Sequence, residues 1–247
     1  RYTEKALQFM TNAHESGDPF FLYLPHTMPH IPLFASERFK GTSARGLYGD
    51  TIEEIDWSVG QILEKLKELG IDENTLVVYT SDNGPWNLKN GHGGSAYPLR
   101  GFKFSTWEGG MRVPCIMRWP GQIPAGMVND EVCGTIDMMP TFSALAGVSL
   151  SSDRVIDGHN IFPLMKHGAS VCSPHKAYYY YKGNNLVAVR QGDWKLHKMR
   201  SGKERKWELY NLKTDIGESQ NVYEKNRETA ERLIALMNEF DGRMQEN

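Results

Sequence analysis

The chain has 247 residues, of which 40% are hydrophobic and 23% are charged, and its formal net charge is −2. This length can bury a substantial core and form one large domain or a domain with a smaller companion. The near-neutral charge argues against nucleic acid as a partner, and no apolar run approaches the roughly 18 residues of a membrane span. The 24 glycines and 12 prolines indicate a globular protein rich in loops.

The three cysteines, Cys115, Cys133 and Cys172, are odd in number and lack the spacing of metal ligands. Cys115 lies in the apolar run VPCIMRW, so we expect it to be a small core residue rather than a reactive thiol. This cysteine usage leaves the cellular compartment open.

The first quarter of the chain predicts a helix and then a strand. Ala6, Phe9, Met10 and Ala13 share one helical face, and the turn residues 16–19 follow them. The apolar run FFLYL (20–24) predicts a buried strand. The loop after it carries His26 and His30 among three prolines that exclude a helix.

Apolar residues recur at steps of three and four over residues 52–69, which predicts a helix with one continuous apolar face. Asp50 and Glu53 have the spacing of a capping box at its start, and Gly70 suits the position just after its end.

The run LVVYT (76–80) predicts a second buried strand, and Asp82 and Asn83 follow it directly. A carboxylate beside an amide oxygen offers the hard ligands that Ca²⁺ or Mg²⁺ prefers, although Asn-Gly-Pro is also an ordinary turn. Strands that alternate with helices favour parallel pairing. In that case His30 and Asp82 would follow the same edge of the sheet and face one crevice.

A passage without clear periodicity runs from Pro85 to Gly110, and a loop of this length is more often functional than idle. Lys103 lies there between aromatic residues, where it is either a surface lysine packed on rings or a positive charge aimed at an oxyanion. A strand is expected over residues 113–119, and Asp137 is expected to cap a helix that contains Pro140 in its first turn.

After about residue 170 the pattern changes to short strand-like runs at 178–181, 186–190, 194–197 and 207–212, separated by turn residues. This spacing predicts an antiparallel meander. A final amphipathic helix follows, with apolar residues from Ala230 to Met244. We therefore expect two domains, 1–170 and 171–247.

The candidate residues suit the electrostatic handling of a sulfate or phosphate group. His30 can hydrogen-bond an anion or protonate a leaving oxygen, Lys103 can face an oxyanion, and Asp82 with Asn83 can hold a hard cation. For each of them an ordinary loop or surface role is the alternative. The chain shows no nucleophile with an activating partner.

Several stretches, in order along the chain, resemble the type I sulfatases of the alkaline-phosphatase-like superfamily. They are PHIP (29–32), YGDTIEEIDWSVGQIL, TSDNGP, FKFSTWEGGMRVP followed by WPG, IDMMPTFSALAG, QGDWKLH and ELYNLKTDIGESQNV. The resemblance covers nearly the whole chain. Within the family, GTSARGLYGD and SDRVIDGHN are most similar to enzymes that remove 6-sulfate from N-acetylgalactosamine.

The resemblance implies an α/β fold with a mixed, largely parallel sheet flanked by helices, and a smaller carboxyl-terminal antiparallel sheet with one helix. It implies that Asp82 and Asn83 bind Ca²⁺, with Mg²⁺ the weaker choice. It further implies that Lys103 contacts the sulfate and that His30 contacts the sulfate or the leaving oxygen. The family's formylglycine motif, Cys/Ser-x-Pro-x-Arg, is absent, so we expect a carboxyl-terminal portion of such an enzyme.

The implied function is a sulfuric ester hydrolase that uses formylglycine and Ca²⁺ to remove sulfate from a carbohydrate, as in glycosaminoglycan degradation, or from an aryl ester. We expect the chain alone to be inactive, to bind Ca²⁺ weakly, and to need the amino-terminal part of the same catalytic domain as its partner. Trp86, His92 and Arg100 are the candidate sugar contacts. The resemblance suggests a periplasmic, secreted or lysosomal location. The alternatives are a phosphodiesterase or phosphonate hydrolase and a non-catalytic carbohydrate-binding relative.

Overall fold

The structure, a computed structural model, describes residues 1–87, 91–201 and 204–246. It divides into two compact units, each of which is described by itself. Unit 1 comprises Arg1–Val78, Trp86–Ser95 and Ile116–Ala125. Unit 2 comprises Tyr79–Pro85, Ala96–Cys115 and Gly126–Asn247. The predicted domains 1–170 and 171–247 stay a prediction.

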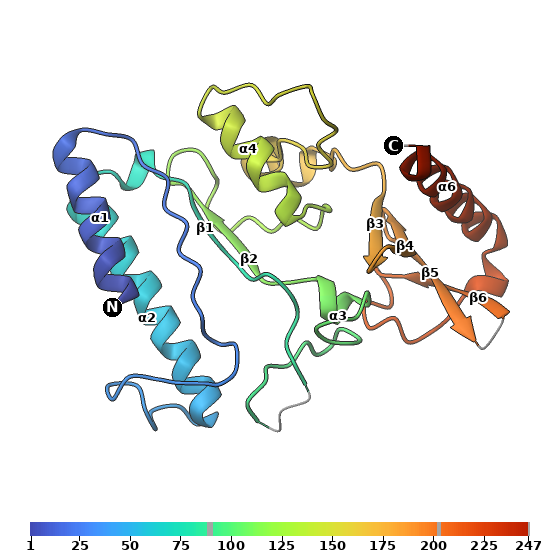
Figure 1. Cartoon of the computed structure of the whole chain (residues 1–247), viewed down its shortest axis with the longest axis horizontal. Helices are drawn as coiled ribbons and strands as arrows, with labels where there is room; N and C mark the ends of the chain where they lie inside the picture. Colours follow the sequence, from blue (N-terminus) through green and yellow to red (C-terminus); the bar gives the residue numbers. More distant parts are fainter. Residues whose placement is uncertain (88–90, 202–203, 247) are drawn as a thin grey trace. The chain divides into compact units, whose positions relative to one another are not determined.

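Two long helices, α1 (Tyr2–Ser16) and α2 (Gly46–Glu68), lie side by side in unit 1 (Figure 1). Their facing sides bury apolar residues such as Met10 and Leu66, as the sequence periodicity predicts. A buried hydrogen bond of 2.7 Å joins the hydroxyls of Thr3 and Ser58 across this interface. Both predicted helices are therefore confirmed, and each buries an apolar face.

The predicted start of α2 is wrong, because the helix begins at Gly46 and already contains Asp50. The Asp50 carboxylate accepts hydrogen bonds of 2.8 Å from the backbone N–H groups of Gly41 and Ser43. These hydrogen bonds lower the pKa of Asp50 and attach the preceding loop to the helix. The end is as expected, since Gly70 adopts a φ of 68° just after Leu69.

The strand predicted at residues 20–24 does not form. Phe21 and Tyr23 are 69% and 76% exposed, so one side of this extended segment is not covered as a buried strand requires. Without a strand here, the described ranges contain no largely parallel sheet, and that part of the expected fold is wrong. Because no strand forms at residues 20–24, the prediction that His30 and Asp82 follow the same edge of one sheet is wrong.

Two short strands, β1 (Val77–Thr80) and β2 (Cys115–Arg118), pair as a two-stranded sheet. The first was predicted to be a buried strand and Cys115 of the second a core residue, and both expectations are wrong: β1 is half-buried only in its first two residues, and Cys115 is exposed. A two-stranded ribbon has no further strands to cover it, so its side chains stay accessible.

The remaining short helices in the described chain are the α-helices α3 (Glu108–Met111), α4 (Met138–Leu145) and α5 (Phe162–His167), and the 3₁₀ helices η1 (Asp72–Asn74), η2 (Thr135–Asp137), η3 (Gly168–Ser170) and η4 (Tyr223–Lys225). The helix predicted after Asp137 is confirmed as α4, with Pro140 in its first turn. None of the helices in the described ranges is both long and apolar enough to cross a bilayer.

The predicted meander is confirmed. Strands β3 (Tyr178–Lys182), β4 (Asn185–Gln191), β5 (Trp194–Ser201) and β6 (Glu204–Asn211) form an antiparallel sheet in sequence order. The final helix α6 (Arg227–Glu246) packs against β4 and β5 (Figure 1). The core between helix and sheet is formed by Leu186, Val189, Leu196, Leu209, Ala230, Leu233 and Met237.

Replacing Leu233 with alanine should lower the free energy of unfolding by about 2–5 kcal/mol, because Leu233 is completely buried in this core. Urea denaturation followed by circular dichroism measures this change. The matched control is Glu231→Ala on the exposed side of α6, which should stay within about 0.5 kcal/mol of wild type. Equal effects of the two substitutions would contradict the assigned helix face.

Candidate functional site

The predicted metal ligands Asp82 and Asn83 follow β1 in a turn of unit 2. Asp82 is exposed and Asn83 is half-buried. The side-chain amide of Asn83 donates a hydrogen bond to Oδ2 of Asp82. This bond orients the two side chains, and it leaves the amide oxygen Oδ1 of Asn83 and Oδ1 of Asp82 as acceptors.

These two residues fit a hard cation by their chemistry, since both offer oxygen atoms of the kind that Ca²⁺ coordinates. Ca²⁺ takes six to eight oxygen ligands, and the turn supplies only part of such a shell. Nowhere in the described ranges do three or more His, Cys, Asp or Glu side chains gather as a metal site. The predicted ligand role of Asp82 and Asn83 stays a prediction.

Lys103 lies in a tight loop that leads into α3. Its ammonium is 5.5 Å from the ring centroid of Phe104, a residue with the unusual φ of 73°. The hydroxyl of Ser105 accepts the N–H of Phe102 at 3.1 Å and donates to its carbonyl oxygen at 2.7 Å. The backbone around Lys103 is therefore held in one conformation by its own turn.

Two backbone hydrogen bonds bring the Asp82–Asn83 turn and the Lys103 loop together in unit 2. The N–H of Gly84 donates to the carbonyl oxygen of Gly110, and the N–H of Lys103 donates to that of Pro85, both at 3.0 Å. The predicted cation ligands and the predicted oxyanion-binding lysine thus belong to segments that are fixed to each other.

Glycines make this close approach possible. A Cβ atom on Gly84 would lie 1.9 Å from the carbonyl oxygen of Gly109, and one on Gly110 would lie 2.3 Å from that of Ser105. Only a residue without a side chain allows the two backbones to approach so closely.

The candidates in unit 1 are His30, Trp86 and His92. His30 is exposed, and its Nδ1 lies 2.8 Å from the carbonyl oxygen of Ile31. Because a carbonyl only accepts, Nδ1 carries the proton, and Nε2 is the nitrogen that can face a ligand. The rings of His30 and Trp86 are 6.0 Å apart, and His92 is exposed. Their predicted roles stay predictions.

His26 lines a cavity of about 300 Å³ in unit 1, together with residues of α1, α2 and the loop around Ser36. Burial lowers the pKa of His26, because the charged imidazolium loses its hydration. The cavity has a mixed lining that includes Thr51, Glu54 and Ser58, and no arrangement of a nucleophile with a base is among them.

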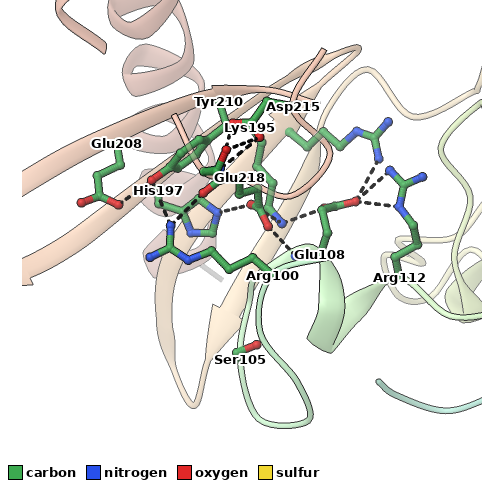
Figure 2. A network of polar contacts seen from close by, with 12 residues as sticks. Arg100, Ser105, Glu108, Arg112, Lys195, His197, Glu208, Tyr210, Asp215 and Glu218 are labelled. Carbon is green, nitrogen blue, oxygen red and sulfur yellow. Dashed lines mark hydrogen bonds and ion pairs between the residues drawn. The ribbon is translucent and has the colours of Figure 1, made fainter. Parts of the chain in front are cut away.

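Arg100, a predicted sugar contact, has several partners within unit 2. Its NH1 group donates to the hydroxyl of Tyr210 at 3.2 Å and to the carbonyl oxygen of Glu218 at 2.9 Å. The guanidinium carbon lies 3.7 Å from the ring centroid of Trp107. Arg100 therefore joins the residues just before α3 to the carboxyl-terminal sheet (Figure 2).

A buried network of charged residues surrounds the start of α3 (Figure 2). Lys195 Nζ lies 2.7 Å from Glu108 Oε1 and 3.3 Å from Glu218 Oε1. Glu218 also accepts the backbone N–H of Glu108 at 2.7 Å and hydrogen-bonds His197 Nε2 at 2.9 Å. Arg112 donates from Nε to Glu108 Oε2 at 2.8 Å. These interactions neutralise both buried carboxylates.

The environment sets the protonation of this network. Burial raises the pKa of Glu108, but the positive charges of Lys195, Arg112 and Arg190 outweigh it, so the net shift is downward. Burial lowers the pKa of His197 and outweighs the opposing effect of the hydrogen bond that its ring donates to Glu218. Glu108 is thus ionised and His197 neutral near pH 7, and the network has no group poised to act as a nucleophile.

Another buried carboxylate, Asp137, lies elsewhere in unit 2. It accepts the backbone N–H groups of Gly134 at 2.7 Å and His159 at 2.8 Å, and its two oxygens lie 2.8 and 2.9 Å from His175 Nε2. These contacts hold the start of α4 against residues 159 and 175.

Comparisons with known proteins connect this geometry to a family. The family model described as Sulfatase matches residues 1–148, and the model described as N-sulphoglucosamine sulphohydrolase, C-terminal, matches residues 102–245. Together the two models span the amino-terminal helices, the Asp82–Asn83 turn, the Lys103 loop and the carboxyl-terminal sheet.

Among curated relatives, the chain is 44% identical over 222 residues to mouse N-acetylgalactosamine-6-sulfatase, covering 90% of this chain and 42% of that protein. It is 44% identical over 195 residues to human steryl-sulfatase, covering 77% of this chain and 33% of that protein. The crystal structure of the PsFucS1 sulfatase from Pseudoalteromonas sp. matches with a TM-score of 0.90 at 27% identity, covering 98% of this chain and 52% of that one. The chain thus spans less than half the length of these curated relatives.

Gly84→Ala should destabilise unit 2, because its methyl group would collide with the Gly109 carbonyl and separate the two loops. We expect a loss of about 1–3 kcal/mol in the free energy of unfolding, measured by urea denaturation. The matched control is Gly60→Ala in α2, where a Cβ meets no atom within 4 Å and helix propensity favours alanine. A destabilised control together with a tolerated Gly84→Ala would contradict the packing.

The free energy of unfolding should decrease as the pH is lowered from neutral into the acid range. The folded pKa of His197 lies below the ordinary 6.5 and that of Glu108 below 4.5, so the unfolded chain binds more protons in both cases. The stabilisation from His197 is present above pH 6.5 and is lost as the pH falls below that value. The contribution of Glu108 is lost below pH 4.5.

Melting temperatures measured between pH 5.5 and 7.5 test the His197 contribution. His197→Gln should make this dependence less steep, and a remaining slope is expected from His26, whose pKa burial also lowers. An unchanged slope in His197→Gln would show that another group titrates.

Proposed function

The chain belongs to the sulfatase family, and from this membership we propose that the protein containing it hydrolyses sulfate esters with the help of Asp82, Asn83 and Lys103. The observation that carries the proposal is the pair of backbone hydrogen bonds that joins the Asp82–Asn83 turn to the Lys103 loop. Because these segments are joined, the oxygen atoms of Asp82 and Asn83 and the ammonium of Lys103 could act on the same substrate. A cation and an ammonium group together stabilise the negative charge of an anionic ester.

The proposed chemistry of unit 2 is charge handling. A sulfuryl group in transfer carries negative charge on its oxygen atoms, and the Lys103 ammonium is the group that we propose to face them. The oxygens of Asp82 and Asn83 would hold Ca²⁺, which supplies a Lewis acid when bound. The tight turn at Phe104 and Ser105 fixes the backbone beside Lys103, which supports a lysine held in place for an anion.

We propose a carbohydrate as the alcohol part of the substrate, with a 6-sulfated amino sugar as the first compound to test. The mouse relative is named for such a sugar, and the family model over residues 102–245 is named for a sulfated glucosamine. The human relative of equal identity is named for a steryl sulfate, so aryl and steryl sulfates belong in the same test. We propose exposed His92 and half-buried Trp86 as sugar contacts, and Arg100 as a weaker candidate because its NH1 group already donates to the carbonyl oxygen of Glu218.

Lys103→Ala in the full-length protein should lower kcat for a chromogenic aryl sulfate by about 10²–10³-fold, because one preorganised charge at the sulfuryl oxygens is lost. Steady-state kinetics measures the effect, and thermal melting verifies that the variant is folded. Lys213→Ala, at an exposed position of unit 2, is the matched control and should keep the wild-type kcat. A folded Lys103→Ala variant with normal kcat would refute the proposal.

The substrate class is tested by kcat/KM values of the wild-type protein on paired esters of one alcohol. Sulfate should exceed phosphate and phosphonate by at least tenfold if the protein is a sulfatase. A preference for the phosphate or phosphonate ester would instead assign the protein to phosphoryl or phosphonyl transfer.

A further inference from the structure

The loop from Arg100 to Arg112 contacts two parts of unit 2 at once. On one side its backbone binds the Asp82–Asn83 turn through Gly84 and Pro85. On the other side its side chains enter the buried network of the carboxyl-terminal sheet (Figure 2). The proposed function uses the first contact only and gives no role to the second.

Glu108 is where this loop is anchored to the sheet. Its side chain is 2% exposed and bridges Lys195 of β5 and Arg112, while its backbone N–H is bound by Glu218. Both the backbone and the carboxylate of one residue are thus fixed by charged partners. Such charge-assisted hydrogen bonds are short and directional, so they define the position of a loop more strictly than apolar packing does.

The residue before Glu108 is held by rings and charges as well. Trp107 contacts both Arg100, whose guanidinium carbon is 3.7 Å from its ring centroid, and His197, whose ring centroid is 4.0 Å away. His197 is in turn hydrogen-bonded to Glu218. Trp107 and Glu108 therefore connect Lys103, a few residues earlier in the loop, to a rigid four-stranded sheet.

We infer that Glu108 is a positioning residue: through Lys195, Arg112 and Glu218 it fixes the loop that carries Lys103 and supports the Asp82–Asn83 turn. This inference rests on the proposed function for the part that concerns turnover. Glu108 itself is buried and touches no substrate in this arrangement. Loss of its charge should let the loop shift, and a displacement of about 1 Å at a reacting group can cost about 10²-fold in rate.

The test uses the full-length protein with the substitution Glu108→Gln, which keeps the shape and removes the charge. On an aryl sulfate, kcat should fall about 10–100-fold while KM changes less than threefold, because the Lys103 contact matters most in the transition state. Isothermal titration of the metal-depleted protein with CaCl₂ should show a Kd for Ca²⁺ that is raised about tenfold or more, because the Asp82–Asn83 turn is hydrogen-bonded to the same loop.

The matched control is Asp137→Asn, which alters a carboxylate of unit 2 that is equally buried and does not contact the loop. It should lower the melting temperature but leave kcat and the Ca²⁺ affinity at wild-type values. If it lowers kcat as much as Glu108→Gln does, the effect of Glu108 is general destabilisation and the inference is overturned.

If Glu108→Gln does not fold, a second variant, Arg112→Gln, tests the same inference. Arg112 is half-exposed and donates to Glu108, so its loss should change kcat in the same direction by a smaller factor. Wild-type kcat and Ca²⁺ affinity in the folded variants would overturn the inference. If the wild-type protein hydrolyses no sulfate ester, the proposed function is wrong. The CaCl₂ titration then still tests the positioning role of Glu108.

Discussion

The burial of Glu108 is the constraint on which the arrangement of unit 2 depends. A carboxylate with 2% exposure is tolerated only where opposite charges replace its hydration, and Lys195 and Arg112 supply them. Lys195 has no exposed surface and requires acidic partners in return, which Glu108 and Glu218 provide. Each buried charge therefore requires its partner at a defined distance. Together these ion pairs fix the position of the loop before α3 relative to the carboxyl-terminal sheet.

Much of the fold could be predicted from local patterns. The helices α1, α2, α4 and α6 and the meander β3–β6 follow from apolar periodicity and turn residues, since these elements bury one face against a neighbouring element. The pairing of β1 with β2 links residues 77–80 with 115–118, and no local pattern indicates which strand is the partner. For the candidate site, the oxygen atoms of Asp82 and Asn83 and the ammonium of Lys103 suggest a chemistry from the sequence, and their roles stay predictions.

What could not be predicted depends on distant partners. Residues 20–24 have a strand's composition, but composition does not supply a neighbouring strand, and Phe21 remains exposed. Asp50 has a cap's spacing, yet its carboxylate binds N–H groups from the loop before the helix. In the sequence, Lys195 and His197 resemble polar residues on the solvent-facing side of an amphipathic strand. Their inward direction depends on Glu218, which is about twenty residues later in the chain and whose burial no local pattern reveals.

The glycine contact between the two site loops also has a consequence for how such a site can diversify. Gly84, Gly109 and Gly110 leave no volume for a side chain, so these positions are closed to variation without rearrangement of the loops. His92, Ser95 and Tyr97 of the same long passage are exposed and free of this restriction. Substitutions in this passage are therefore expected to be tolerated at these exposed positions and not at the three glycines. A library of variants of this passage keeps more folded members when it samples the exposed positions and leaves the glycines intact.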